Sequence, residues 1–245
     1  MQPRIHFLIL SIMILTTTVC KAQVGVVTNN LTLNDRVENF ITNSNCDENE
    51  LNELVRMIQK QGDLLQGLRV MNVAVKRFPD SYYAHYMRGF YNRNLENFEE
   101  AIFDFSKAIS IEPLYAGAYN DRGECYQALN QVAEANADFN SAIMESEKLL
   151  NAGLQYEGIE FAKPFALVGL GRIKEVREWI KNYMGDDYYD VACLYSKMRD
   201  RENTLIYIKK ALENGYSNID FIKADNCMKC IADSEEFVNL INQYK

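Results

Sequence analysis

The middle of the sequence repeats at a constant spacing of 34 residues. Alanines occupy equivalent positions in three successive segments, at Ala74, Ala108 and Ala142, and Pro79 and Pro113 follow the first two. Three further series keep the same spacing: Gly67, Ala101 and Ala135; Met71, Phe105 and Phe139; Gly89 and Gly123. A period of this length indicates stacked supersecondary units, each too small to cover its own apolar face.

One unit of the repeat, residues 84–113, contains two stretches with helical periodicity, separated at Asn94 to Asn97. Pro113 ends the second stretch because proline lacks a backbone donor and clashes with the preceding turn. Small residues permit two helices to approach closely, and a large residue fills the remaining space. The residues that we expect at this contact are Gly89, Ala101, Phe105 and Ala108. The unit is therefore predicted to be a helical hairpin.

These residues, with Pro113 and the series Tyr119, Gly123, Tyr126, Ala135, Phe139 and Ala142, resemble the tetratricopeptide repeat. The resemblance implies an all-α, right-handed solenoid. It places three repeats at 48–81, 82–115 and 116–149, and two degenerate hairpins within 152–215. Residues 216–245 are expected to form C-terminal capping helices, since such arrays need a polar cap at each end. Residues 23–47 are expected to be a flexible lead-in or a capping helix over Leu33–Ile41.

The first 22 residues have the pattern of a secretory signal peptide. Arg4 precedes a short apolar run, Phe7 to Leu15, and small residues lead to an expected cleavage after Ala22. An uncleaved anchor and a lipid-modified Cys20 are the alternatives, and only these would attach the protein to a membrane. We expect an exported protein, periplasmic or secreted, with attachment to the envelope as the alternative.

The charge balance argues against nucleic-acid partners. The chain has 26 basic and 34 acidic residues. Loss of the leader removes Arg4 and Lys21, which leaves 24 basic residues and a net charge of −10. Nucleic-acid binders carry basic patches, and the sequence has none.

Residues Cys227 to Cys230, CMKC, form the motif that most resembles a catalytic one. A redox pair normally follows a strand and begins a helix, whereas this segment is expected in a helical tail with Cys230 facing the core. We therefore favour structural cysteines, with a thiol–disulfide redox protein as the alternative function. Zinc would need further ligands from Cys46, Cys125 or Cys193, which belong to separate units.

Histidine is too rare for most catalytic arrangements. Without the leader, only His85 remains, at a position where the family has a large apolar residue, so we expect it to be packed. Paired acids such as Glu99 and Glu100 are expected at helix starts, where the helix dipole favours them. We predict no enzyme activity, no catalytic residue, no cofactor, no metal site and no small-molecule substrate.

The resemblance places the first helix of each repeat on a concave groove. In the second repeat, spacings of three and four residues put Tyr83, Tyr86 and Phe90 on one helical stripe. The polar residues predicted beside this stripe are Arg56, Arg93, Asn120 and Glu124. An aromatic centre with a polar rim is typical of a peptide-binding site. We therefore expect a non-catalytic adaptor that binds a peptide or helix of a partner protein, unless Tyr86 and Phe90 only pack against adjoining helices.

Overall fold

The computed structural model describes residues 31–154 and 158–244, and this part of the chain is all-α, without a β-strand. The predicted leader and Cys20 lie outside the described residues. The helices are α2 (Leu33–Thr42), α3 (Glu48–Gln61), α4 (Leu64–Arg77), α5 (Tyr82–Asn94), α6 (Phe98–Ile111), α7 (Ala116–Ala128), α8 (Val132–Asn151), α9 (Ile159–Gly169), α10 (Ile173–Asn182), α11 (Tyr188–Lys197), α12 (Arg201–Glu213), α13 (Ile219–Ala224), the 3₁₀ helix η2 (Asn226–Met228) and α14 (Glu235–Asn242).

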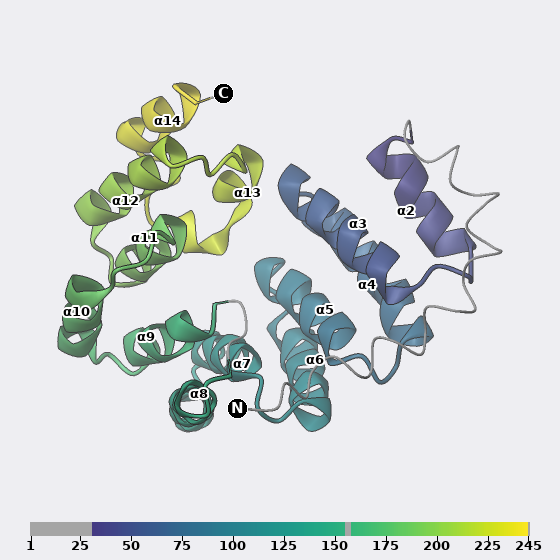
Figure 1. The fold of residues 1–245 in the computed structure, drawn as a ribbon, viewed down its shortest axis with the longest axis horizontal. Coiled ribbons are helices and arrows are strands. Elements are labelled where there is room, and N and C mark those ends of the chain that lie inside the picture. The colour runs from purple at the N-terminus through teal and green to yellow at the C-terminus, as the bar shows by residue number, and fades with distance from the viewer. Residues whose placement is uncertain (1–30, 155–157, 245) are drawn as a thin grey trace, which may run out of the picture.

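Consecutive helices pack against each other along the chain, as in a helical-repeat solenoid. Helix α5 packs on α6, α6 on α7, α7 on α8 and α8 on α9. Helix α2 covers α3 and α4 at the beginning of the array (Figure 1). The fold class is therefore the helical solenoid that the 34-residue period predicts.

The turns between paired helices repeat the same backbone conformation. Gly62, Glu96 and Asn130 follow one another at the repeat spacing and have φ values of 68°, 64° and 59°. Gly171 and Arg199 hold the same position in the two later hairpins, with φ of 71° and 59°. A left-handed residue after a helix redirects the chain and leaves the last carbonyls with partners. The turn geometry thus continues after the side-chain period has faded.

Close approach between paired helices explains the small residues of the repeat. A Cβ atom at Gly89 would lie 2.8 Å from the ring of Phe105, and one at Gly123 would lie 2.8 Å from the ring of Phe139. Both phenylalanines are fully buried. The predicted contact of small residues against a filling phenylalanine is confirmed in both repeats.

His85 is packed, as predicted. The residue is buried on α5, and its Nε2 atom lies 3.0 Å from the carbonyl oxygen of Pro79. Its other ring nitrogen, Nδ1, lies 3.6 Å from a carboxylate oxygen of Asp104. The side chain therefore belongs to the interior of the second repeat.

The array curls back on itself, so that its C-terminal part meets its N-terminal part (Figure 1). Helix α14 packs on α12, whereas α13 packs on α3, far earlier in the chain. The Nδ2 group of Asn218 donates to the carbonyl of Gln59 at 3.4 Å, and that of Asn226 donates to the carbonyl of Asn94 at 3.4 Å. The tail was expected only to cap the array, but it also closes it.

None of the helices in residues 31–154 and 158–244 has the length and apolar character that a membrane crossing requires.

Candidate functional site

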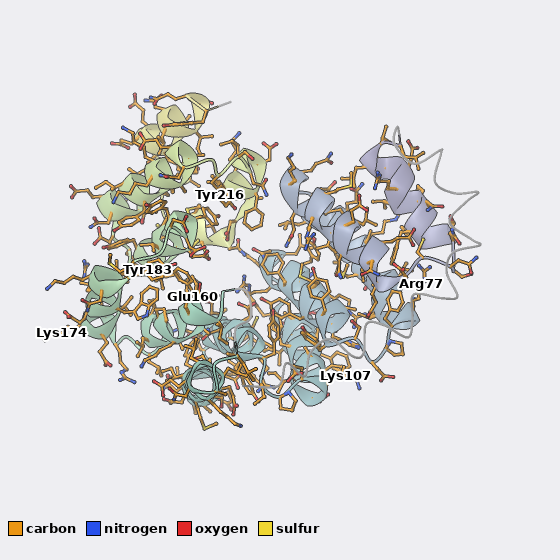
Figure 2. All side chains as sticks on the ribbon, viewed as in Figure 1. Arg77, Lys107, Glu160, Lys174, Tyr183 and Tyr216 are labelled. Carbon is orange, nitrogen blue, oxygen red and sulfur yellow. The ribbon has the colours of Figure 1, made fainter. Side chains whose placement is uncertain are left out.

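The closed array surrounds a cavity of about 560 Å³, which we call the central cavity. Most of its wall comes from α5, α7, α9, α11 and the segment from α13 to η2, with single residues from α3 and α8. Tyr216 lies on this inner side, whereas Lys174 points away from the array (Figure 2). The aromatic residues of the wall are Tyr82, Tyr86, Phe90, Tyr115, Phe161, Phe165, Tyr189, Tyr216 and Phe221. This volume lies within the range of about 300–1,000 Å³ that is usual for binding sites.

Five of the seven predicted groove residues line the central cavity. They are Tyr86, Phe90, Arg93, Asn120 and Glu124. The first three lie on one stripe of α5, and the other two lie one helical turn apart on α7. The array thus brings residues of two successive repeats to one place.

Tyr83 and Arg56 are not part of this cavity wall. Tyr83 directly follows the wall residue Tyr82 on α5 and packs against the core formed by α2 to α5. Arg56 is exposed on α3, whose contribution to the wall is Gln59. Because each helical residue turns by about 100° relative to the last, neighbours in sequence face different surroundings.

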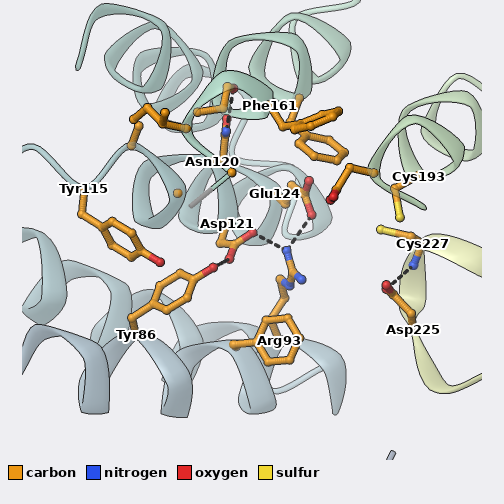
Figure 3. Close-up of a pocket in the computed structure, with 18 of the residues that line it drawn as sticks. Tyr86, Arg93, Tyr115, Asn120, Asp121, Glu124, Phe161, Cys193, Asp225 and Cys227 are labelled. Atoms are coloured by element: carbon orange, nitrogen blue, oxygen red, sulfur yellow. Dashed lines mark hydrogen bonds and ion pairs between the residues drawn. The ribbon is translucent and has the colours of Figure 1, made fainter. Parts of the chain in front are cut away.

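A charged network crosses the cavity wall between three helices (Figure 3). The Nη1 atom of Arg93 lies 2.5 Å from a carboxylate oxygen of Asp121 and 3.0 Å from one of Glu124. Lys197 on α11 reaches the other oxygen of Glu124, at 2.5 Å. Tyr86 donates its hydroxyl hydrogen to Asp121 at 2.9 Å. Two cations therefore balance two carboxylates, which makes the burial of these charges tolerable.

The environment shifts the pKa values of the two acids in opposite directions. Burial raises the pKa of Asp121, and its neighbours Arg93 and Tyr86 only partly offset that effect. Burial acts in the same direction on Glu124, but Lys197 and Arg93 outweigh it, so the pKa of Glu124 falls below its ordinary value. For Lys197, burial would lower the pKa, yet Glu124 outweighs it and the pKa rises. The Glu124–Lys197 pair is therefore ionised at neutral pH.

Two polar atoms in the wall lack hydrogen-bond partners among the described residues. Asn120 is buried and donates through Nδ2 to the carbonyl of Ala162 at 2.7 Å, but its Oδ1 atom is unpaired. The Nε atom of Arg93 is unpaired as well. A buried polar atom without a partner carries a desolvation cost of about 1–3 kcal/mol. Both groups would gain from a bound molecule that supplies a partner.

Tyr86 both packs and lines the cavity. Its ring lies 4.7 Å from the ring of Tyr115, in an edge-to-face arrangement, and 5.7 Å from the ring of Phe105. Burial, first of all, and the nearby Asp121 raise the pKa of its hydroxyl, so it stays protonated and donates. Tyr86 therefore packs against neighbouring helices, as the alternative interpretation expected, and it also lines the cavity.

The thiols are arranged differently from the sequence prediction. Cys230 was expected to face the core, but it is exposed, because the segment forms η2 and a turn instead of a regular helix. Its Sγ atom lies 2.9 Å from the hydroxyl of Ser196. The thiol that lies beside Cys227 is the buried Cys193 of α11. The closure of the array therefore brings the thiols of Cys193 and Cys227 together, although the sequence places them in separate units.

Sequence reasoning missed several residues of this wall, including Asp121, Lys197 and Phe161. Asp121 follows the predicted Asn120 directly, so helical geometry alone could have included it. Lys197 and Phe161 come from hairpins where the 34-residue period is lost, and no signal in those segments marks them as neighbours of the second and third repeats.

Comparison with known families agrees with the repeat. Residues 82–115 match the family model of the tetratricopeptide repeat, with the same boundaries that the resemblance implied for the second unit. No curated protein matches the chain. Tetratricopeptide repeats generally form non-catalytic surfaces for protein–protein interaction.

Proposed function

From the premise that this chain is a tetratricopeptide-repeat solenoid, we propose that it is a scaffold that binds a short segment of a partner protein in the central cavity. The observation that carries the proposal is the convergence of Tyr86, Phe90 and Arg93 from one repeat with Asn120 and Glu124 from the next. Rigid aromatic anchors beside a few placed polar groups are typical of peptide recognition.

The unpaired atoms of the wall suit a peptide group. Each peptide unit carries one N–H donor and one C=O acceptor. The free Oδ1 of Asn120 accepts, and the free Nε of Arg93 donates. Neighbouring side chains cover both atoms in the unbound protein, so binding includes a local rearrangement of the wall.

The closure of the array favours an extended segment over a helix as the bound form. A helix with its side chains is about 10–12 Å in diameter. Helix α13 and η2 lie across the side of the array that an open solenoid would leave free for such a helix. An extended chain is thinner and exposes the backbone groups that Asn120 and Arg93 would pair with.

A photo-crosslinking pair tests the proposal. p-Benzoylphenylalanine is placed either at Phe90, in the cavity wall, or at Phe103, which is 67% exposed on α6. Circular dichroism verifies that both proteins are folded before irradiation in cells. We expect adducts with one contiguous segment of a partner from position 90 and not from position 103.

A synthetic peptide of the crosslinked segment then gives the affinity. We expect Phe90→Ala to weaken its binding at least about tenfold, which corresponds to about 1.4 kcal/mol, and Phe103→Ala to leave it unchanged. The same adducts from both positions would contradict the proposal. So would a small molecule retained in native mass spectrometry as the sole occupant of the cavity.

We also propose that the protein is exported, on the pattern of residues 1–22 alone. Mass spectrometry of the amino terminus of the protein isolated from its own cells tests this directly. A start at Gln23 supports cleavage, and a lipid on Cys20 supports the envelope-anchored alternative. An intact Met1 on protein isolated from the cytoplasm contradicts export.

The redox alternative based on Cys227 and Cys230 has less support from the geometry. Cys230 is exposed beside Ser196, whereas Cys227 lies against Cys193. The thiol in contact with Cys227 is that of Cys193, which lies outside the CMKC motif.

A further inference from the structure

Three soft or anionic ligand groups meet at the edge of the central cavity. Cys193 comes from α11, and Asp225 and Cys227 come from the segment that joins α13 to η2. One ligand atom of each residue lies within 4.8 Å of the other two. The two sulfur atoms point toward each other across the gap between these segments (Figure 3). All three residues line the cavity.

We propose that Cys193, Asp225 and Cys227 bind a thiophilic divalent cation of the zinc class. Thiolate sulfur and carboxylate oxygen are both common zinc ligands, and the pair of thiolates selects against magnesium and calcium. In a tetrahedral site with Zn–S bonds of about 2.3 Å, neighbouring sulfurs lie about 3.8 Å apart. The separation of up to 4.8 Å therefore needs a contraction of only about 1 Å.

The three residues leave the fourth coordination position to a water molecule on the cavity side. Zinc sites with three protein ligands and an open position are accessible to solvent or to a bound molecule, unlike closed structural sites. Since the ligand atoms face the cavity, a metal here would be part of its wall.

Hydrogen bonds already hold the ligand groups in place. Tyr189 donates its hydroxyl hydrogen to one carboxylate oxygen of Asp225 at 2.8 Å, and the backbone N–H of Cys227 donates to the other at 2.8 Å. The hydroxyl of Ser196 donates to the carbonyl of Cys227, which fixes η2 on α11. Such outer contacts orient metal ligands and are themselves important for affinity.

Binding would exchange protons for the metal. Thiols bind a metal as thiolates, so metal binding to Cys193 and Cys227 releases their protons. A divalent cation bound to both sulfurs displaces two protons, and two thiolates with one carboxylate leave the complex with a charge of −1. The side chains of Arg93 and Lys197 interact with Cys227 and compensate a negative charge at this place.

The sequence predicted no metal site because Cys193 and Cys227 belong to different units. The fold overcomes that separation, since the C-terminal segment folds back against α11. Cys230, the partner suggested by the CMKC spacing, is exposed and outside the ligand group. This difference supplies a matched control within the same motif.

Cobalt titration of the full mature chain tests the inference. The protein is kept reduced with a phosphine, so that Cys193 and Cys227 cannot form a disulfide, and Co²⁺ is added. Thiolate ligation gives an intense sulfur-to-cobalt charge-transfer band in the near ultraviolet. We expect one equivalent of Co²⁺ to bind per chain, and Zn²⁺ to abolish the band by displacement.

Variants assign the ligands. We expect Cys193→Ser and Cys227→Ser each to reduce the band by at least half, and Asp225→Asn to weaken cobalt binding at least tenfold. Cys230→Ser should retain both the band and the affinity of the parent. Circular dichroism verifies folding. Cys193 is buried, and if its serine variant is unfolded, the Cys227→Ser variant tests the thiolate ligation, because Cys227 is only half-buried. Absence of the band in the parent, or its loss in Cys230→Ser with retention in Cys227→Ser, would overturn the proposal.

Discussion

The ammonium group of Lys197 lies 2.5 Å from a carboxylate oxygen of Glu124, although 73 residues separate the two in the sequence. Glu124 belongs to the third repeat, on α7, and Lys197 to the last hairpin, on α11. Both side chains are about one quarter exposed, at 24% each. The pair thus joins two distant parts of the array across the wall of the cavity.

Loss of this pair should destabilise the fold. Lys197→Met removes one partner and leaves the partly buried carboxylate of Glu124 with Arg93 alone. We expect the free energy of unfolding to fall by about 1.5–3 kcal/mol, because a charged hydrogen bond is lost in a partly buried place. Urea denaturation followed by circular dichroism measures the change.

Lys163→Met is the matched control for that variant. Lys163 lies 2.6 Å from Glu147, but these side chains are 38% and 48% exposed. Solvent screens such a pair, so its loss should change stability by less than about 1 kcal/mol. Equal losses of stability in the two variants would show that the Glu124–Lys197 pair contributes no more to the free energy of unfolding than an exposed ion pair.

The stability difference between the parent and Lys197→Met should depend on pH. Lys197 and Arg93 lower the folded-state pKa of Glu124 from its ordinary value of 4.5. A depressed carboxyl pKa contributes stability that is present above pH 4.5 and is lost as the pH falls through the lower, folded-state value. The difference should therefore be constant above about pH 5 and shrink below pH 4.5.

Urea denaturation of both proteins at several pH values tests this dependence. Burial raises the pKa of Asp121, so protonation of that residue favours the fold as the pH falls. That contribution occurs in both proteins. Because Lys197 also lowers the pKa of Asp121, its loss raises that pKa further, so the difference shrinks on acidification for this reason too. A difference that grows on acidification would contradict the ionised pair described here.

The periodic part of the sequence predicts most of the fold because each repeated position has a fixed structural task. Arg88 makes two hydrogen bonds to Asp104, and Arg122 makes the same two bonds to Asp138, at the same spacing of 16 residues. The series Arg88–Arg122 and Asp104–Asp138 keep the 34-residue step, so this buried ion pair was accessible to sequence reasoning although we did not predict it.

The remainder of the site depends on how far the array curls, and the repeat pattern does not encode that curvature locally. Small rotations add up from hairpin to hairpin until α13 meets α3. Lys197 and Cys193 reach the cavity only as a result of this closure. Their segments have no periodic signal, which explains why Tyr86 and Asn120 were predicted and these residues were not.

Substitution of Gly67 tests the close packing between the first two repeats. A Cβ atom there would lie 2.2 Å from a ring carbon of Tyr91, which is almost fully buried. We expect Gly67→Ala to destabilise the protein by about 1–3 kcal/mol, because the rigid ring has no free space to move into. Thermal and urea denaturation measure the loss.

Gly117→Ala provides the comparison for Gly67→Ala, since both positions are helical. A Cβ atom at Gly117 would meet nothing closer than 3.6 Å, the ring of Tyr115. Replacement of glycine by alanine at an unstrained helical position stabilises by about 0.4–1 kcal/mol. Opposite signs for the two variants are expected, and a neutral Gly67→Ala would refute the contact with Tyr91.

Closure of the array should depend on Gly62, the turn residue between α3 and α4. Gly62 has φ of +68°, and a Cβ atom there would lie 2.9 Å from the carbonyl oxygen of Asp220 on α13. Gly62→Val would therefore push α13 away from α3 in addition to straining the turn.

Gly153→Val introduces comparable backbone strain, at φ of +69°, but with no atom within 4 Å of the new Cβ. Hydrogen–deuterium exchange of the α13 amides, residues Ile219–Ala224, distinguishes the two effects. We expect faster exchange of α13 in Gly62→Val and parent-like exchange in Gly153→Val, because only the first substitution reaches the contact that closes the array. Unchanged exchange in both variants would mean that α13 is held by α11 and η2 alone, and that its contact with α3 contributes little to the closed form.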